Sequence, residues 1–133
     1  MQTFLPSPSF TISLSCLDRQ RLGKQRVEVW QLLNRHFPHH PCHAMWQGYR
    51  NCLAYYGLVA CYLWRARGYR DSLLQKIGRL YRPTSKITFP PWLGNQAFHA
   101  SHRSNLLRKN FPYYSQLGWK ESPNLPYIWP RTY

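Results

Sequence analysis

Apolar residues recur at three- and four-residue steps in two long stretches of the chain, which is the spacing of one helix face. The first stretch predicts a helix over about residues 15–35, with Leu22, Val29 and Leu33 as its inward stripe. The second predicts a long central helix over about residues 43–67, whose apolar positions are Met45, Tyr49, Cys52, Tyr56, Val59 and Leu63. Because Pro38 and Pro41 cannot continue a helix, we expect a loop between the two stretches.

Turn-forming residues mark the other boundaries. Pro6 and Pro8 predict an irregular arm over the first ten residues. Gly68 predicts the end of the central helix, and a short third helix is expected over about residues 71–81. After a proline-rich loop over residues 82–94, Asn95 predicts the N-cap of a last helix over residues 96–109.

The tail over residues 110–133 is dense in proline and aromatic residues, too aromatic for a solvated linker, and we expect it to wrap over the helices. No stretch shows the alternation of a β-strand at useful length, and no internal repeat occurs. The pattern therefore predicts an all-α fold: a compact single-domain helical bundle over residues 1–133, with a long central helix and a wrapped aromatic and proline-rich C-terminal arm.

Charge narrows the class of partner. Eighteen Lys and Arg residues face four acidic ones, for a formal net charge of +14. The self-repulsion of such a chain is tolerated most easily when a polyanion neutralises it, so nucleic acid is the first candidate. An anionic membrane is second, but the chain shows no clean amphipathic anchor, and its longest uncharged stretch, residues 51–64, is shorter than the roughly 20 residues of a membrane span.

The start of the chain and its cysteines predict the compartment. MQTFLPSPSF has neither the basic start nor the apolar block of a signal peptide. Four cysteines without CxxC spacing, two of them in the apolar central helix, indicate free buried thiols in a reducing compartment. We expect a cytoplasmic monomer.

Glu28 lies in the most basic run of the chain, LDRQRLGKQRVE. On a helix it shares one stripe with Arg21, Lys24, Gln31 and Arg35. Two interpretations are open. Glu28 forms an i,i+4 ion pair with Lys24, worth a few tenths of a kcal/mol. Alternatively, the acid is held where an anionic substrate docks and handles a proton or a developing positive charge.

The last predicted helix carries FHASHRSNLLRK, a sequence typical of a phosphate-binding face or of a solvated one. The net charge favours binding, through His102, Arg103, Arg108 and Lys109 among others. Tyr113, Tyr114 and Trp119 follow in the tail and are candidates for stacking on unpaired bases, at about 1 to 3 kcal/mol each. Most other aromatic residues belong to the core.

Metal and nucleotide chemistry are disfavoured. The run HFPHHPCH offers metal-capable side chains at His36, His39, His40, Cys42 and His43, with a second pair at His99 and His102. Neither set shows the paired short spacings of a structural zinc site, so we expect no metal. No P-loop, GxGxxG or GxSxG motif occurs, and four scattered acids do not build a two-metal nuclease.

The run LDRQRLGKQRVE, with Gln20, Leu22 and Glu28 in that spacing, resembles the catalytic helix of the pyrimidine-dimer DNA glycosylase family, the phage endonuclease V type. The later segments LWRARGY and RSNLLRKNFPYYSQLGW look like that family's long-helix end and aromatic C-terminal segment. HPxxxMWxGY, PPWLG and HRSNLLRK are similar to bacterial relatives of unproven activity. The resemblance covers most of the chain with sparse identities.

The resemblance implies a mostly helical protein that flips a nucleotide, cuts the glycosidic bond of a damaged pyrimidine in double-stranded DNA and nicks the abasic site, without metal or cofactor. Glu28 takes the place of the family's essential glutamate. The family's nucleophile is the α-amine of a threonine exposed by loss of the initiator methionine, whereas this chain begins Met1-Gln2. Either the α-amine of Met1 serves, with Lys24 as the alternative nucleophile, or the imine chemistry is lost.

An α-amine suits this role, because its ordinary pKa of about 7.7 to 8.0 is nearer neutrality than the roughly 10.4 of lysine. Val27 stands where the family has an arginine, and Arg26 is one position away. The expected location is cytoplasmic, associated with the nucleoid. The expected DNA contacts are Gln20, Arg21, Arg26, His102, Arg103, Arg108, Lys109, Tyr113, Tyr114 and Trp119. The rivals are a non-catalytic nucleic-acid-binding domain on the same fold and a histidine-dependent metallonuclease.

Overall fold

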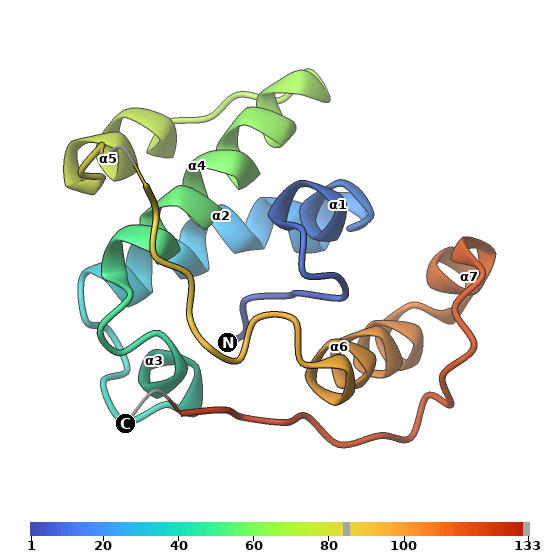
Figure 1. Cartoon of the computed structure of the whole chain (residues 1–133). Helices are drawn as coiled ribbons and strands as arrows, with labels where there is room; N and C mark the ends of the chain where they lie inside the picture. The colour runs from blue at the N-terminus through green and yellow to red at the C-terminus, as the bar shows by residue number, and fades with distance from the viewer. Residues whose placement is uncertain (84–85, 132–133) are drawn as a thin grey trace.

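Helices alone make up the regular structure of the described part of the chain, residues 1–83 and 86–131 of a computed structural model (Figure 1). The all-α prediction is confirmed. The elements in chain order are α1 (Phe10–Ser15), α2 (Arg19–Leu33), α3 (Pro41–Met45), α4 (Arg50–Ala66), α5 (Leu73–Leu80), α6 (Gln96–Lys109), α7 (Phe111–Tyr114) and the 3-10 turn η1 (Ser115–Leu117). Residues 84 and 85 of the predicted loop and the last two residues of the predicted tail lie outside the described residues.

The first predicted helix is wrong in its N-terminal part, because two helices meet there. The Ser9 side chain accepts a hydrogen bond from the backbone N–H of Ile12 and caps α1. Asp18 then adopts an extended backbone as the N-cap of α2. Between the two helices, Leu17 is fully buried in the core. The helical periodicity of the sequence does not reveal that the helix is interrupted at this point.

The long central helix is shorter than predicted. Pro41 does not end a helix but begins α3, where its missing N–H costs nothing, and the His40 side chain caps this start. The chain then turns at Gly48, whose φ of 83° suits glycine, and α4 begins at Arg50. The stop at Gly68 is confirmed.

The predicted third and last helices are confirmed as α5 and α6, and the Asn95 side chain caps α6 by accepting from the N–H of Phe98 at 3.0 Å. Helix α7 and the turn η1 are additional to the prediction. Asn110 caps α7, and Gly118 ends η1 with a φ of 79°.

Helices α2 and α4 form the centre of the core, with α1 and α5 against α4. The predicted stripe of Leu22, Val29 and Leu33 is buried on α2. Gly57 of α4 allows the two helices to approach closely, since a Cβ there would lie 2.6 Å from Cγ1 of Val29.

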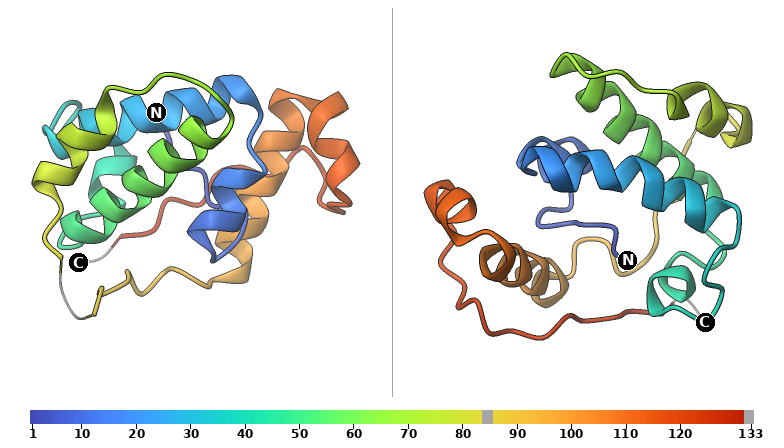
Figure 2. Two further views of the ribbon diagram at one scale, coloured as in Figure 1. Left: turned by 90° about the horizontal axis from the view of Figure 1, so that it is seen from above. Right: turned by 180° about the vertical axis from the view of Figure 1, so that it is seen from behind.

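The N-terminal segment and the described part of the C-terminal arm pack against the helices. The N-terminal segment runs inward and ends between α2 and α6 (Figures 1 and 2). The C-terminal arm passes along α6 toward α3, where the Trp129 and His40 rings meet edge to face. Ser104 and Asn105 of α6 bind the backbone of Leu125, at 3.0 and 3.1 Å. The wrapped arm is therefore confirmed.

Candidate active site

A cavity of about 240 Å³ lies where α2, the N-terminal segment, the end of α6 and the C-terminal arm meet. Its lining residues are Met1, Gln2, Phe4, Gln20, Arg21, Lys24, Glu28, Lys109 and Tyr127. The fold thus brings the first residue of the chain to the same cavity as Glu28 and three cationic side chains. A larger cavity of about 320 Å³ beside α3 is lined by two arginines and a histidine, but by no carboxylate.

Glu28 is half-buried in this cavity. Its carboxylate accepts a hydrogen bond from Nε2 of Gln25 at 3.0 Å and a second one from the backbone amide of Gln2. Burial raises the pKa of Glu28 above its ordinary value, against the opposing effect of the nearby N-terminal amine, the Gln2 amide, Lys24 and Gln25. The acid is therefore held beside the start of the chain, in a setting that disfavours its charged form.

The ion-pair interpretation of Glu28 fails on geometry. Within the described residues, the ion pairs shorter than 4.0 Å join arginines to Asp18, Asp71 and Glu121 and leave Glu28 out. Lys24 lies close enough to lower the pKa of Glu28, yet its side chain is exposed and makes no such pair. Glu28 is thus accessible to a substrate from the cavity.

Two buried side chains hold the N-terminal segment by its backbone. Gln25, fully buried on α2, donates from Nε2 to the carbonyl of Gln2 at 2.8 Å and accepts from the N–H of Phe4 at 2.9 Å. Tyr56 of α4 donates to the carbonyl of Phe4 at 2.8 Å. Because these bonds fix residues 2 to 4, they fix the direction in which the α-amine of Met1 leaves the core.

Helix α6 completes this clamp. The N–H of Leu5 donates to Nδ1 of His102 at 2.8 Å, and the carbonyl of Leu5 lies 2.7 Å from Nδ1 of His99. Arg103 donates to the carbonyl of Pro6 at 2.8 Å. Burial lowers the pKa of His102 to about 3, so its ring stays neutral and can accept this bond. His102 is fully buried and, contrary to the prediction, does not present its ring to DNA.

The arginines of α6 contact the chain itself. Arg103 forms a bidentate pair with Glu121 of the arm at 2.8 and 3.0 Å. Arg108 donates to the carbonyl of Pro123 at 2.8 Å and to the Asn105 side chain. The polar face that predicted phosphate binding therefore holds the two ends of the protein, and Lys109 is the α6 cation that lines the cavity.

Lys109 and Arg21 bring positive charge to the cavity from two different helices. Burial, together with Arg21 and Arg108, holds the pKa of Lys109 below its ordinary value. Arg21 is oriented by Asp18, whose Oδ2 accepts from the guanidinium at 2.8 Å. A negatively charged substrate is favoured in such a field.

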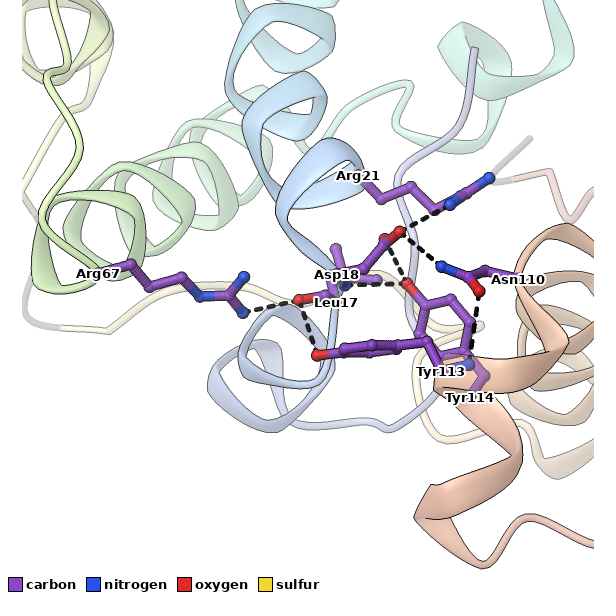
Figure 3. Close-up of polar contacts among 7 residues, drawn as sticks. All are labelled: Leu17, Asp18, Arg21, Arg67, Asn110, Tyr113 and Tyr114. Carbon is purple, nitrogen blue, oxygen red and sulfur yellow. Dashed lines mark hydrogen bonds and ion pairs between the residues drawn. The ribbon is translucent and has the colours of Figure 1, made fainter.

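A network around Asp18 joins α7 to the start of α2 (Figure 3). The hydroxyl of Tyr114 donates to Oδ1 of Asp18 at 2.8 Å and accepts from the Asp18 N–H at 3.1 Å, and Asn110 donates to Oδ2 at 3.2 Å. Burial opposes the charge on Asp18, but the bonds from Tyr114, Asn110 and Arg21 hold its pKa below the ordinary value. Tyr114 is fully buried and is not available to stack on a base. The Trp119 ring lies parallel to the Tyr114 ring, with 5.6 Å between the ring centres.

The other side of α2 carries an open groove of about 700 Å³, lined by Asp18, Arg19, Gln20, Gly23, Lys24, Arg26, Val27, Trp64 and Tyr113. Gln20 and Lys24 line both the groove and the cavity, so the exposed edge of α2 separates the two hollows. Arg26 pairs with Asp71 and lies 4.7 Å from the Trp64 ring centre. Tyr113 is 39% exposed, which leaves it available to a ligand.

The sequence did not predict that Gln2, Asp18, Gln25, Asn110 and Tyr127 position the site. One signal was available for Gln25: it falls on the apolar stripe of α2, between Leu22 and Val29, where a polar residue needs a buried partner. The partners of the others lie far away in sequence, as with Asp18 and Tyr114, and no local pattern identifies them.

Two further predictions concern metals and membranes. Among residues 1–83 and 86–131, no group of three or more His, Cys, Asp or Glu side chains is arranged to hold a metal ion. The four cysteines are free. Over the same residues, every helix is too short or too polar to cross a membrane.

A comparison with protein families finds one whose model matches residues 1–76, which is more than half of the chain. The family is described as pyrimidine dimer DNA glycosylase. The match includes Met1, Lys24 and Glu28, and it ends before α6 begins. Neither the curated proteins nor the solved structures contain a match.

Proposed function

Because the chain belongs to the pyrimidine dimer DNA glycosylase family, we propose that it excises a damaged or modified pyrimidine from double-stranded DNA and then nicks the abasic site. The observation that carries the proposal is one cavity that holds both the α-amine-bearing residue Met1 and the half-buried acid Glu28, surrounded by cations. Such a pairing suits an amine nucleophile with a proton-transfer group beside it.

In the proposed reaction, the neutral α-amine of Met1 attacks C1′ of the deoxyribose, and the bond from C1′ to the base breaks. Glu28 stabilises the positive charge that develops on the sugar and accepts a proton from the new N–C1′ centre. Ring opening gives an imine, with O4′ taking up a proton. Loss of a C2′ proton then expels the 3′ phosphate and nicks the strand.

The fixed N-terminal segment supports Met1 as the nucleophile in this scheme. Gln25, Tyr56 and His102 bind the backbone of residues 2 to 5 through hydrogen bonds of 2.8 Å, as a positioned nucleophile requires. Lys24 is the alternative amine, since it lines the same cavity. Its exposed, flexible side chain is less restrained than the N-terminus.

DNA contacts are proposed for Gln20, Arg21, Lys24 and Lys109 around the cavity, and for Arg26 and Tyr113 along the groove. The flipped nucleotide enters the cavity, and the groove across the edge of α2 receives the neighbouring backbone. Extraction of a base costs a few kcal/mol and least at a lesion, which contributes to selectivity. In the present structure the arm occupies Arg103 and Arg108. We propose DNA contacts for Arg103, Arg108 and Trp119 only in a state in which the arm has moved away from α6.

The alternative is a DNA-binding protein of the same fold without turnover, and Glu28→Gln distinguishes the two. The assay uses a duplex with one cyclobutane pyrimidine dimer and a duplex with a preformed abasic site, each under single-turnover conditions. For an enzyme, loss of a positioned acid-base group lowers the rates by about 10²- to 10⁴-fold, while DNA affinity is kept or rises because a negative charge is removed.

Two results contradict the enzymatic proposal. One is a wild-type protein that binds both duplexes but cleaves neither. The other is a Glu28→Gln protein that retains the wild-type rates. Glu121→Gln is the matched control, because Glu121 binds Arg103 at the arm and lies outside the cavity lining. It is expected to change stability modestly and to leave the rates near wild type.

A further inference from the structure

Two hydrogen-bond donors at the cavity have no partner within the described part of the chain. They are Nε2 of Gln2 and the hydroxyl of Tyr127, and both atoms are buried. Both residues line the cavity that contains Met1 and Glu28. A buried polar group without a partner costs about 1 to 3 kcal/mol, so two of them beside a candidate active site suggest a ligand that they bind.

The orientation of Gln2 is fixed by its neighbours. Its side chain is 4% exposed, and its Oε1 accepts from the N–H of Thr3 at 2.9 Å. Because this bond requires the oxygen end of the amide, the remaining end is the NH₂ donor. The backbone carbonyl of Gln2 accepts from Nε2 of Gln25 at 2.8 Å, which fixes the backbone from which this side chain extends.

Tyr127 reaches the cavity from the C-terminal arm. The arm is held on both sides of this residue, by Ser104 on the N–H of Leu125 at 3.0 Å and by Ser101 on the N–H of Ile128 at 3.3 Å. The Tyr127 ring stands edge to face with His102, at 5.6 Å between centres. Burial raises the pKa of Tyr127 to about 12, so the hydroxyl keeps its proton at neutral pH and can donate.

We propose that Gln2 and Tyr127 form the site that binds the departing pyrimidine, by donating hydrogen bonds to its C2 carbonyl oxygen as the glycosidic bond breaks. The inference rests on the proposed glycosylase function and adds a leaving-group site to it. The cavity of about 240 Å³ is several times the roughly 30 Å³ share of one water molecule, so it has room for a ring.

The chemistry of the step calls for such donors. When the amine forms its bond to C1′, the electron pair of the C1′–N1 bond moves onto the pyrimidine, where N1 and the C2 oxygen share the negative charge. Donors already in place for that oxygen stabilise the transition state without reorganisation. The pyrimidine anion is then protonated from solvent, while Glu28 holds the proton released by the amine.

Tyr127→Phe tests the proposal, because it removes one hydroxyl that has no partner among the described residues. Tyr62→Phe, at a tyrosine that is 63% exposed on α4, is the matched control. Each protein is assayed on the dimer duplex, where a glycosidic bond must break, and on the preformed abasic duplex, where none does. The expected result for Tyr127→Phe is a loss of about 10²-fold in excision and less than 3-fold in abasic-site cleavage.

Three other outcomes overturn the inference. Equal losses on both duplexes mean that Tyr127 positions the DNA or the amine, and no loss on either means that the hydroxyl binds only water. If wild-type protein cleaves the abasic duplex but excises no base, the glycosylase proposal itself fails and this inference falls with it. When the wild-type protein excises the base normally, either of the first two outcomes refutes the leaving-group site alone.

Unfolding of Tyr127→Phe in urea separates function from folding. Removal of an unpaired buried hydroxyl is expected to leave the free energy of unfolding unchanged or to raise it. A second variant, Gln2→Met, removes the other donor and keeps a bulky residue after Met1. It is expected to show the same selectivity, with a loss in excision that exceeds the loss in abasic-site cleavage by at least 10-fold. Equal losses in Gln2→Met count against the site.

Discussion

His102 should make the fold sensitive to mild acid. Its imidazole is fully buried and holds the N–H of Leu5, and burial lowers its pKa from 6.5 to about 3. In the unfolded chain the ring gains a proton as the pH falls through 6.5, whereas in the folded protein it stays neutral. Because the unfolded state binds more protons, the stabilisation from this neutral ring is complete above pH 6.5 and is lost as the pH falls toward 3.

The magnitude follows from these two values. Between pH 7 and pH 5 the proton uptake of the unfolded state alone lowers the free energy of unfolding by about 2 kcal/mol. Other groups titrate as well. Burial lowers the pKa of His99, which adds to the loss, and raises the pKa of Glu28, which opposes it. The difference in unfolding free energy between wild type and a variant that lacks only His102 separates the contribution of His102 from those of His99 and Glu28.

The assay is urea unfolding of wild type and His102→Asn at pH 7, 6 and 5. The asparagine oxygen can accept from the Leu5 N–H but does not titrate in this range, so the variant should lose about 2 kcal/mol less than wild type between pH 7 and 5. His36→Asn is the control for replacing an exposed histidine. Equal slopes for wild type and His102→Asn refute the reasoning, as does an NMR titration in which the His102 ring of the folded protein gains a proton above pH 5.

Three further predictions concern packing, the Asp18 network and DNA affinity. Gly57→Ala should lower the free energy of unfolding by about 1 to 3 kcal/mol, because its Cβ would collide with Val29. Gly78→Ala on α5 should raise it by about 0.5 to 1 kcal/mol, because the nearest atom to its Cβ would be Cδ2 of Leu58 at 3.9 Å. Urea unfolding measures both, and equal effects of the two substitutions contradict the close packing at Gly57. Tyr114→Phe should cost about 1 to 3 kcal/mol in the same assay, since a buried carboxylate loses a donor, and a neutral result counts against the network. Lys109→Gln should reduce the slope of log affinity against log salt by about 0.9 on duplex DNA, and an unchanged slope excludes Lys109 from phosphate contact.

Much of the helical fold was predictable because its signals are local. Gly68 and Asn95 mark their helix ends through backbone conformation and a capping bond, both of which depend on a few adjacent residues. The breaks before α2 and after α3 were missed. At the first, Leu17 is buried where two helices meet. At the second, the chain turns at Gly48, whose φ is 83°, within a stretch whose apolar spacing continues across the turn.

The polar face of α6 shows why the site was predicted only in part. His102, Arg103 and Arg108 are residue types that bind phosphate or backbone equally well, and their partners at Leu5, Pro6 and Pro123 become neighbours only in the folded chain. Glu28 was identifiable as a lone acid among cations. Its proximity to Met1 depends on contacts between residues more than 20 positions apart, such as Gln25 with Gln2 and Phe4.

Reductive trapping tests the central proposal most directly. Wild-type protein is incubated with an abasic duplex and borohydride, and the covalent adduct is digested with trypsin and located by mass spectrometry. We expect the DNA remnant on the α-amine of Met1, in the peptide that ends at Arg19, and we expect trapping to vanish when a few residues are added before Met1 but to persist in Lys24→Arg. An adduct on Lys24 or Lys109, or full trapping by the extended protein, would contradict the account.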